Sequence, residues 1–203
     1  MSISGLFLLL FLLVHLSANL TSLVSPELFN ETCRFMGSNP FILAMIPVLS
    51  AGIIIHVLYA VKLTLYNLHA RGPISYAVRN KSKAVSFASK NMFVLGVVIL
   101  SGLALHLVHF WSKMQLKEIT GGVEANPYDL LLYQFSQLQV VIIYLIWIVA
   151  LWFHLTHGFW SAFHTIGLSN QKWIKRLQAI AYICATLIAI GFIVIPIYFY
   201  FLI

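Results

Sequence analysis

Charged residues are scarce in this sequence. Asp, Glu, Lys and Arg together make up 8% of the 203 residues, whereas about a quarter of the residues of a soluble domain are charged. Hydrophobic residues account for 61% of the chain, and the mean hydropathy is +0.95. This composition excludes an ordinary water-soluble globular protein and predicts an integral membrane protein in contact with lipid.

Acidic residues are fewer than basic ones. Five Asp and Glu stand against twelve Lys and Arg, which gives a formal net charge of +7. The basic residues lie in short loops between apolar runs, where they set the topology of a membrane protein, so nucleic acid is excluded as a partner. No acid lies inside an apolar run, and a metal site of mixed carboxylate and histidine ligands is therefore not expected.

Cysteines and linkers are also nearly absent. Cys33 and Cys184 stand in different surroundings, a loop and the last apolar run, and predict neither a disulfide nor a metal site. The sequence contains no Cys-x-x-Cys-His motif, so covalent attachment of a c-type haem is not indicated. No Pro/Gly/Ser-rich linker and no repeat divides the chain, so we expect a single domain over residues 1–203.

Five apolar runs are long enough to cross a bilayer. They extend from Ser4 to Val24, from Pro40 to Tyr66, from Asn91 to Trp111, from Leu130 to Phe163 and from Lys175 to Ile203. The first run has no basic segment before it and no A-x-A cleavage site, and it contains His15, which favours a transmembrane helix over a secretory signal. The sequence therefore predicts an all-α membrane protein, a bundle of five transmembrane helices.

The basic residues indicate the orientation of the chain. Nine of the twelve flank or fill two loops: Lys62, Arg71, Arg79, Lys81, Lys83, Lys90, Lys172, Lys175 and Arg176. The opposite face holds the other three and all the acids: Arg34, Lys113, Lys117, Glu27, Glu31, Glu118, Glu124 and Asp129. By the positive-inside rule, the N-terminus and these two loops face the cytoplasm, and the C-terminus lies outside.

Histidines are frequent for so apolar a chain. Six of the eight lie within the runs: His15, His56, His106, His109, His154 and His157. A single histidine in a membrane helix more often hydrogen-bonds a neighbouring helix than binds a metal. At about 1.5 Å of rise per residue, however, His15 and His106 fall in the outer halves of their helices, and His56 and His157 in the inner halves. Histidines on four helices at two levels predict two stacked haems, each with two imidazole ligands.

The other four histidines are either alternative ligands or residues with a different role. His109 lies one turn beyond His106, near the outer boundary, where an interfacial role is favoured. His154 lies one turn before His157, and depth alone leaves it open as a ligand or a hydrogen-bonding residue. His69 and His164 fall near the cytoplasmic boundary; we expect His69 to be solvated and His164 to be hydrated or to hydrogen-bond a haem propionate.

Short motifs in a fixed order resemble the single-chain cytochrome b subunit of succinate dehydrogenase and fumarate reductase, of the two-haem, five-helix type. They are Gly5-Leu6-Phe7-Leu8, Val14-His15-Leu16, His56-Val57-Leu58-Tyr59-Ala60, Leu105-His106-Leu107 with Phe110-Trp111, and His157-Gly158-Phe159 with Gly167-Leu168. Two further stretches resemble Bacteroidetes-type members: Phe29-Asn30-Glu31 and Ser89-Lys90-Asn91-Met92. The resemblance covers nearly the whole chain.

The resemblance implies a set of ligands. Carried over by motif, His15 and His106 hold the distal, outer haem, and His56 and His157 hold the proximal, cytoplasmic haem. His154 and His109 are then non-ligands, and His164 stands where some relatives have a basic residue near a propionate. Some relatives also have an acid beside the helix-four histidine that assists proton movement, whereas the neighbours in this chain are His154, Leu155 and Thr156.

The resemblance also implies a function. The chain would be the membrane anchor of a succinate:quinone oxidoreductase in the bacterial inner membrane, itself an electron-transfer subunit without the succinate chemistry. It would pass electrons from an iron-sulfur subunit, docked on the basic cytoplasmic face, through two haems b to a quinone, with menaquinone favoured. A flavoprotein subunit on another chain would oxidise succinate or reduce fumarate. Glu31, an acid in the outer loop, is the candidate proton carrier at the quinone, although a solvated loop acid explains it equally.

Two other classes of protein use histidines inside a helix bundle. One is the cytochrome b subunit of another respiratory complex, such as a hydrogenase or a formate dehydrogenase. The other is a proton-coupled transporter without haem, whose histidines relay protons. A b-type absorption band separates the haem proteins from the transporter, and the partner subunits separate the haem proteins from one another.

Overall fold

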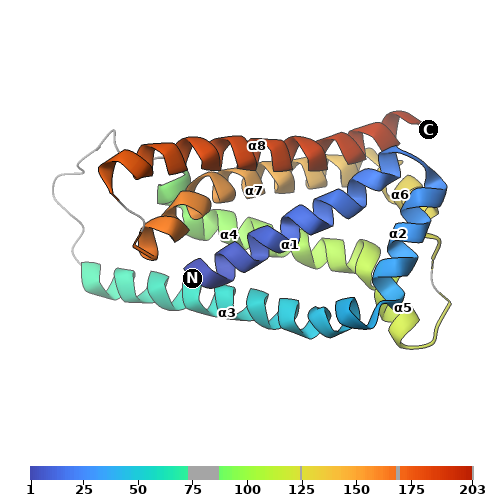
Figure 1. The fold of residues 1–203 in the computed structure, drawn as a ribbon, viewed down its shortest axis with the longest axis horizontal. Helices are drawn as coiled ribbons and strands as arrows, with labels where there is room; N and C mark the ends of the chain where they lie inside the picture. The colour runs from blue at the N-terminus through green and yellow to red at the C-terminus, as the bar shows by residue number, and fades with distance from the viewer. Residues whose placement is uncertain (73–86, 124, 168–169, 203) are drawn as a thin grey trace.

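The computed structural model describes residues 1–72, 87–123, 125–167 and 170–202, and five long helices dominate it (Figure 1). The long helices are α1 Ser2–Leu20, α3 Pro40–Arg71, α4 Phe87–His106, α7 Leu138–Thr165 and α8 Gln171–Leu202. Each lies in a segment long and apolar enough to span a membrane, and no strand occurs among the described residues. For the part of the chain that the structure describes, the prediction of an all-helical fold with five helices long and apolar enough to span a membrane is confirmed.

Short helices gather at one end of the bundle, which we call the short-helix end (Figure 1). They are η1 Thr21–Leu23, α2 Pro26–Ser38, α5 Gln115–Ile119 and α6 Pro127–Phe135, and α4 continues toward them as the π-helical segment η2 Leu107–Trp111. At the opposite end, which we call the N-terminal end, α1 and α8 begin and α3 and α7 finish.

Three helices at or near the short-helix end begin with the same cap. Ser25, Asn39 and Asn126 each accept hydrogen bonds from backbone N–H groups of the first turn and are each followed by proline. A proline at the first helical position costs no hydrogen bond, and the preceding side chain satisfies donors that the helix leaves free. These caps fix where α2, α3 and α6 start.

The fourth apolar run differs from the prediction. We expected one helix from Leu130 to Phe163, but α6 ends at Phe135 and α7 begins at Leu138. Gln137 between them has extended backbone angles (φ −93°, ψ 112°), which interrupts the helical hydrogen bonds. The membrane-spanning part is therefore α7 alone, and Leu130 belongs to a separate short helix.

Helix α7 lies at the centre of the bundle and contacts α1, α4 and α8. Glycines permit close crossings: a Cβ on Gly102 of α4 would overlap the indole ring of Trp147 of α7, and one on Gly191 of α8 would press on Leu16 of α1. Helix α3 is different, because none of its 32 residues is buried. It contacts α1 most, α2 next and α4 more sparsely, so its connection to the other long helices is loose.

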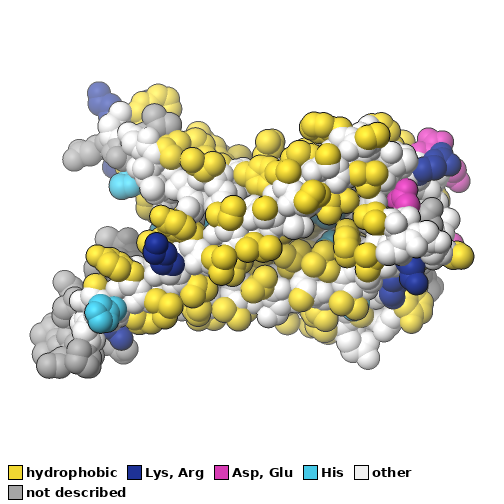
Figure 2. All heavy atoms as spheres, turned by 90° about the horizontal axis from the view of Figure 1, so that it is seen from below, with side chains coloured by type: hydrophobic (Ala, Val, Ile, Leu, Met, Phe, Trp, Pro, Cys, Tyr) yellow, Lys and Arg dark blue, Asp and Glu magenta, His cyan; other side chains and the backbone are white. Residues whose placement is uncertain are grey.

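The surface divides by polarity along the bundle. Apolar side chains cover its length, and the acidic side chains seen in Figure 2 gather at the short-helix end. The described acids all belong to segments at that end: Glu27, Glu31, Glu118 and Asp129. This is the pattern of a multi-pass membrane protein with an apolar middle and polar ends.

Candidate functional site

His15 and His106 face each other inside the bundle. His15 comes from α1 and His106 is the last residue of α4, and their ring centroids lie 5.7 Å apart with the rings nearly perpendicular. His15 also stacks on Phe11 of its own helix, with centroids 5.3 Å apart. The structure thus brings together the two histidines that the depth argument assigned to the outer level.

His56 of α3 faces α7. Its ring contacts that of His154, with centroids 6.3 Å apart and an interplanar angle of 62°. His157, one turn farther along α7, lies edge-on against Trp160 at 5.1 Å. The structure therefore places His154 against His56, while the resemblance selected His157, and both histidines lie near this level of the bundle.

The two histidine pairs lie at different depths. Helix α1 touches both, since Ser4 hydrogen-bonds the His56 ring and His15 contacts His106. Ser4 and His15 are eleven residues apart, which is about 16 Å at the rise of an α-helix. The bundle therefore contains two separate imidazole pairs stacked along its axis.

The chemistry of these groups fits haem better than a smaller metal site. Nδ1 atoms of His106, His154 and His157 are buried without a hydrogen-bond partner, and such orphaned polar atoms require an explanation. Within the described ranges, no cluster of three or more His, Cys, Asp or Glu is placed to hold a metal ion. Facing imidazoles in pairs, from different helices, are the donor set of a six-coordinate haem.

Two neighbours of the histidines were not anticipated. The Asn19 amide nitrogen donates to the His15 carbonyl oxygen at 2.8 Å and lies 3.3 Å from Nε2 of the same residue. Ser4 Oγ lies 3.1 Å from Nδ1 of His56. Asn19 stands one helical turn after His15, and this spacing could have predicted their contact. Ser4 is 52 residues from His56, and no sequence pattern predicts that contact.

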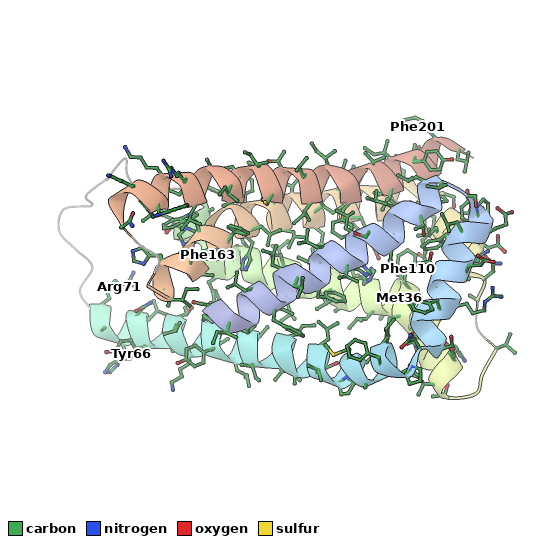
Figure 3. The ribbon with its side chains drawn as sticks, in the orientation of Figure 1. Met36, Tyr66, Arg71, Phe110, Phe163 and Phe201 are labelled. Atoms are coloured by element: carbon green, nitrogen blue, oxygen red, sulfur yellow. The ribbon has the colours of Figure 1, made fainter. Side chains whose placement is uncertain are left out.

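An aromatic wall surrounds His106. Rings of Phe110, Trp147 and Tyr144 lie 5.4 Å, 5.7 Å and 6.4 Å from it, measured between centroids. The Trp147 N–H donates to the carbonyl of Ile99 at 3.0 Å, which ties the indole to α4. In Figure 3, Phe110 lies toward the short-helix end, and Arg71 and Phe163 lie at the opposite end.

His109 has different partners from His106. It lies in the π-helical segment, closed by a bond from the Ser112 N–H to the Leu107 carbonyl, and such segments often mark functional sites. Its ring stacks on Tyr144 at 5.9 Å, and Nδ1 lies 3.3 Å from the tyrosine hydroxyl. Its described ring and hydrogen-bond contacts are thus directed to Tyr144 and Phe110.

The remaining predicted residues lie at the ends of the bundle. His69 and His164 are exposed near the N-terminal end, and the His164 ring lies 6.4 Å from that of Trp160. Glu31 is exposed on α2 at the short-helix end, with its carboxylate 3.8 Å from the Arg34 guanidinium. Most of the predicted docking loop from Arg71 to Lys90, residues 73–86, lies outside the described residues.

The fold and the paired histidines define a multi-pass helical membrane protein with imidazole pairs inside its bundle. The sequence is similar to the succinate dehydrogenase cytochrome b558 subunit of Bacillus subtilis (strain 168), with 25% identity over 174 residues. The similarity spans 83% of this chain and 78% of that protein. No family model and no solved structure matches the chain. This distant similarity supports the succinate dehydrogenase cytochrome b family.

Proposed function

We propose that this chain is the membrane anchor and electron-transfer subunit of a succinate:quinone oxidoreductase and that it holds two haems b. The observation that carries the proposal is the pair of histidine contacts, drawn from four helices and stacked at two depths. The similarity to the Bacillus subtilis cytochrome subunit supports the same function. The electron acceptor in the membrane is a quinone, with menaquinone favoured by the sequence resemblance.

The histidines have assigned roles in this proposal. His15 and His106 would hold the outer haem, and His56 and His157 would hold the inner haem. His154 competes with His157, because its ring is the one against His56. Haem held by these residues would supply one-electron transfer.

Other side chains have proposed roles near the haems and the quinone. Phe110, Tyr144 and Trp147 exclude water from His106 and limit the rotation of its ring. His164, exposed near the N-terminal end, is proposed to hydrogen-bond a haem propionate at the membrane boundary. Glu31 is proposed to carry a proton to or from the quinone, and its exposure at the short-helix end gives it access to water.

The N-terminal end is proposed to face the cytoplasm and to receive the iron-sulfur subunit, which in turn carries the flavoprotein subunit. Its described basic residues are Lys62, Arg71, Lys90, Lys172, Lys175 and Arg176. Basic side chains on a cytoplasmic face agree with the positive-inside rule and attract an acidic partner surface.

The test is to purify the chain from its native membrane with the proteins bound to it. The expected result is a reduced-minus-oxidised spectrum with b-type bands, two haems per polypeptide by pyridine haemochrome assay, and a flavoprotein and an iron-sulfur protein in the preparation. A chain without haem would refute the proposal in favour of the transporter. Haem accompanied by hydrogenase or formate dehydrogenase subunits would refute the assignment to succinate oxidation.

A further inference from the structure

The hydrogen bonds around Ser4 determine which nitrogen of His56 carries the proton. Ser4 Oγ lies 2.9 Å from the carbonyl oxygen of Met1 and 3.1 Å from Nδ1 of His56. A serine hydroxyl has one hydrogen to donate and two lone pairs that accept, and a carbonyl oxygen can only accept. One of these two contacts must therefore be donated by Ser4 and the other accepted by it.

Only one assignment satisfies both contacts. If Ser4 donated to the His56 ring, its oxygen would lie 2.9 Å from the Met1 carbonyl oxygen with no hydrogen between them. If Ser4 donates to the Met1 carbonyl, its oxygen is free to accept from an N–H on Nδ1 of His56. Neutral imidazole carries a single N–H, so the second assignment leaves Nε2 with its lone pair.

The orientation of the His56 ring agrees with this assignment. A Cβ placed on Gly5 of α1 would lie 3.5 Å from Cε1 and 3.9 Å from Nδ1 of His56, so this edge of the ring faces α1. The ring also meets His154 of α7, with centroids 6.3 Å apart. Among the described residues, Ser4 is the recorded hydrogen-bond partner of His56, and none is recorded for Nε2.

The same tautomer occurs at the other level. The Asn19 amide nitrogen donates one hydrogen to the His15 carbonyl, which identifies this atom as the nitrogen. It has a second hydrogen to donate and lies 3.3 Å from Nε2 of His15. Nε2 of His15 must then accept, so its ring carries the proton on Nδ1 as well. On both rings, Nε2 is therefore the nitrogen that keeps a lone pair, which is the group a metal would require.

We propose that Ser4 is a positioning residue that holds His56 in the tautomer whose Nε2 binds the inner haem iron, an inference that rests on the proposed function. When one imidazole nitrogen binds a metal, a hydrogen-bond acceptor for the N–H of the other nitrogen fixes the orientation of the ring and increases its basicity. A more basic ligand stabilises the oxidised state of the metal. Ser4 thereby lowers the potential of the inner haem. The role is the same whether His154 or His157 is the second ligand.

Three variants of the intact complex test this role: Ser4→Ala, Ser4→Thr and Ser17→Ala. Ser17 is the matched control, because its hydroxyl donates to the Leu13 carbonyl on the same helix and has no recorded histidine contact. Redox titration and electron paramagnetic resonance of the oxidised haems are the measurements. Ser4→Ala is expected to raise the potential of the inner haem and to change its resonance signal, with the outer haem unchanged. Ser4→Thr retains a hydroxyl and should restore both values, and Ser17→Ala should match the wild type.

The other outcomes separate the inference from the proposed function. A wild-type complex without b-type haem overturns both. Two wild-type haems, with the inner one unmoved by Ser4→Ala, overturn the role of Ser4 alone. Loss of the inner haem in both Ser4→Ala and Ser4→Thr would mean that Ser4 contributes only to packing, and it would overturn the positioning role. A change of potential confined to the outer haem would overturn that role as well.

Discussion

His154 and His157 stand one turn apart on α7, and the Nδ1 atom of each is buried without a partner. His154 has the ring contact with His56, whereas His157 begins the His157-Gly158-Phe159 motif of the resemblance. Two residues three positions apart differ by about 4.5 Å in depth, so the rise of the helix cannot separate them. The choice between them determines the position of the proposed inner haem.

We predict that His157→Ala loses the inner haem and that His154→Ala retains it. Removing an axial imidazole leaves the iron one ligand short, whereas removing a neighbour changes only the packing around it. Haem content and low-temperature spectra of the two variants measure the outcome. The reverse pattern, with haem lost only in His154→Ala, would move the ligand to the residue that the structure places against His56.

A second prediction at the residue scale concerns Cys33 of α2. Burial raises the pKa of its thiol from the ordinary value of 9.0 to about 12. Because the thiolate is the reactive form, alkylation of Cys33 should be slow at neutral pH and should continue to accelerate as the pH rises well above 9. The control is Ser38→Cys, at an exposed position on the same helix, and the measurement is the rate of maleimide labelling against pH. Equal rates at the two positions would mean that α2 does not bury Cys33.

At the scale of elements, long apolar runs were sufficient to predict the five spans. The break between α6 and α7 was missed because the sequence stays apolar on both sides of Ser136 and Gln137. The Asn126-Pro127 start signal of α6 was present and would have identified the extra helix. Residue spacing along a helix likewise predicted that His15 and His106 would meet. The contact between Ser4 and His56 could not be predicted, because the two residues are 52 positions apart on different helices and no repeated spacing in the sequence connects them.

The crossing of α4 and α7 depends on a glycine. We predict that Gly102→Val destabilises the protein by about 1–3 kcal/mol, the usual cost of adding volume to a filled contact. The added atoms would displace Trp147, break its bond to the Ile99 carbonyl and disturb the wall around His106. The outer haem spectrum should therefore change together with the thermal unfolding midpoint in detergent.

Gly96 on the same helix supplies the control for that crossing. A Cβ on Gly96 meets no other atom within 4 Å, so Gly96→Ala should leave the haem spectra unchanged. The unfolding midpoint of Gly96→Ala should equal that of the wild type or rise slightly, because alanine is more favourable than glycine inside a helix by about 1 kcal/mol. If Gly102→Val and Gly96→Ala had equal effects, the close contact between Gly102 and Trp147 would contribute little to stability.

At the scale of the whole molecule, the distribution of charge predicts the orientation in the membrane. We expect a cysteine at Lys172, at the N-terminal end, to be protected from a membrane-impermeant maleimide in intact cells. A cysteine at Val123, which is 94% exposed at the short-helix end, should be labelled. Both variants are made in a background lacking Cys33 and Cys184. Labelling of Lys172→Cys with protection of Val123→Cys would invert the topology and move the docking face for the iron-sulfur subunit to the other side.

Helix α1 reaches both histidine pairs, through Ser4 and through His15, and this has a consequence for the speed of the proposed electron transfer. The rate of electron tunnelling through protein falls steeply with distance, so a pair of redox centres works reliably only if their spacing is constant. In this protein, eleven residues of one continuous helix set that spacing at about 16 Å along the axis. Helices that tilt or slide past one another would alter which side chains line each site. The interval between the two sites, however, is set by the backbone hydrogen bonds of α1, and it would stay nearly constant during such movements.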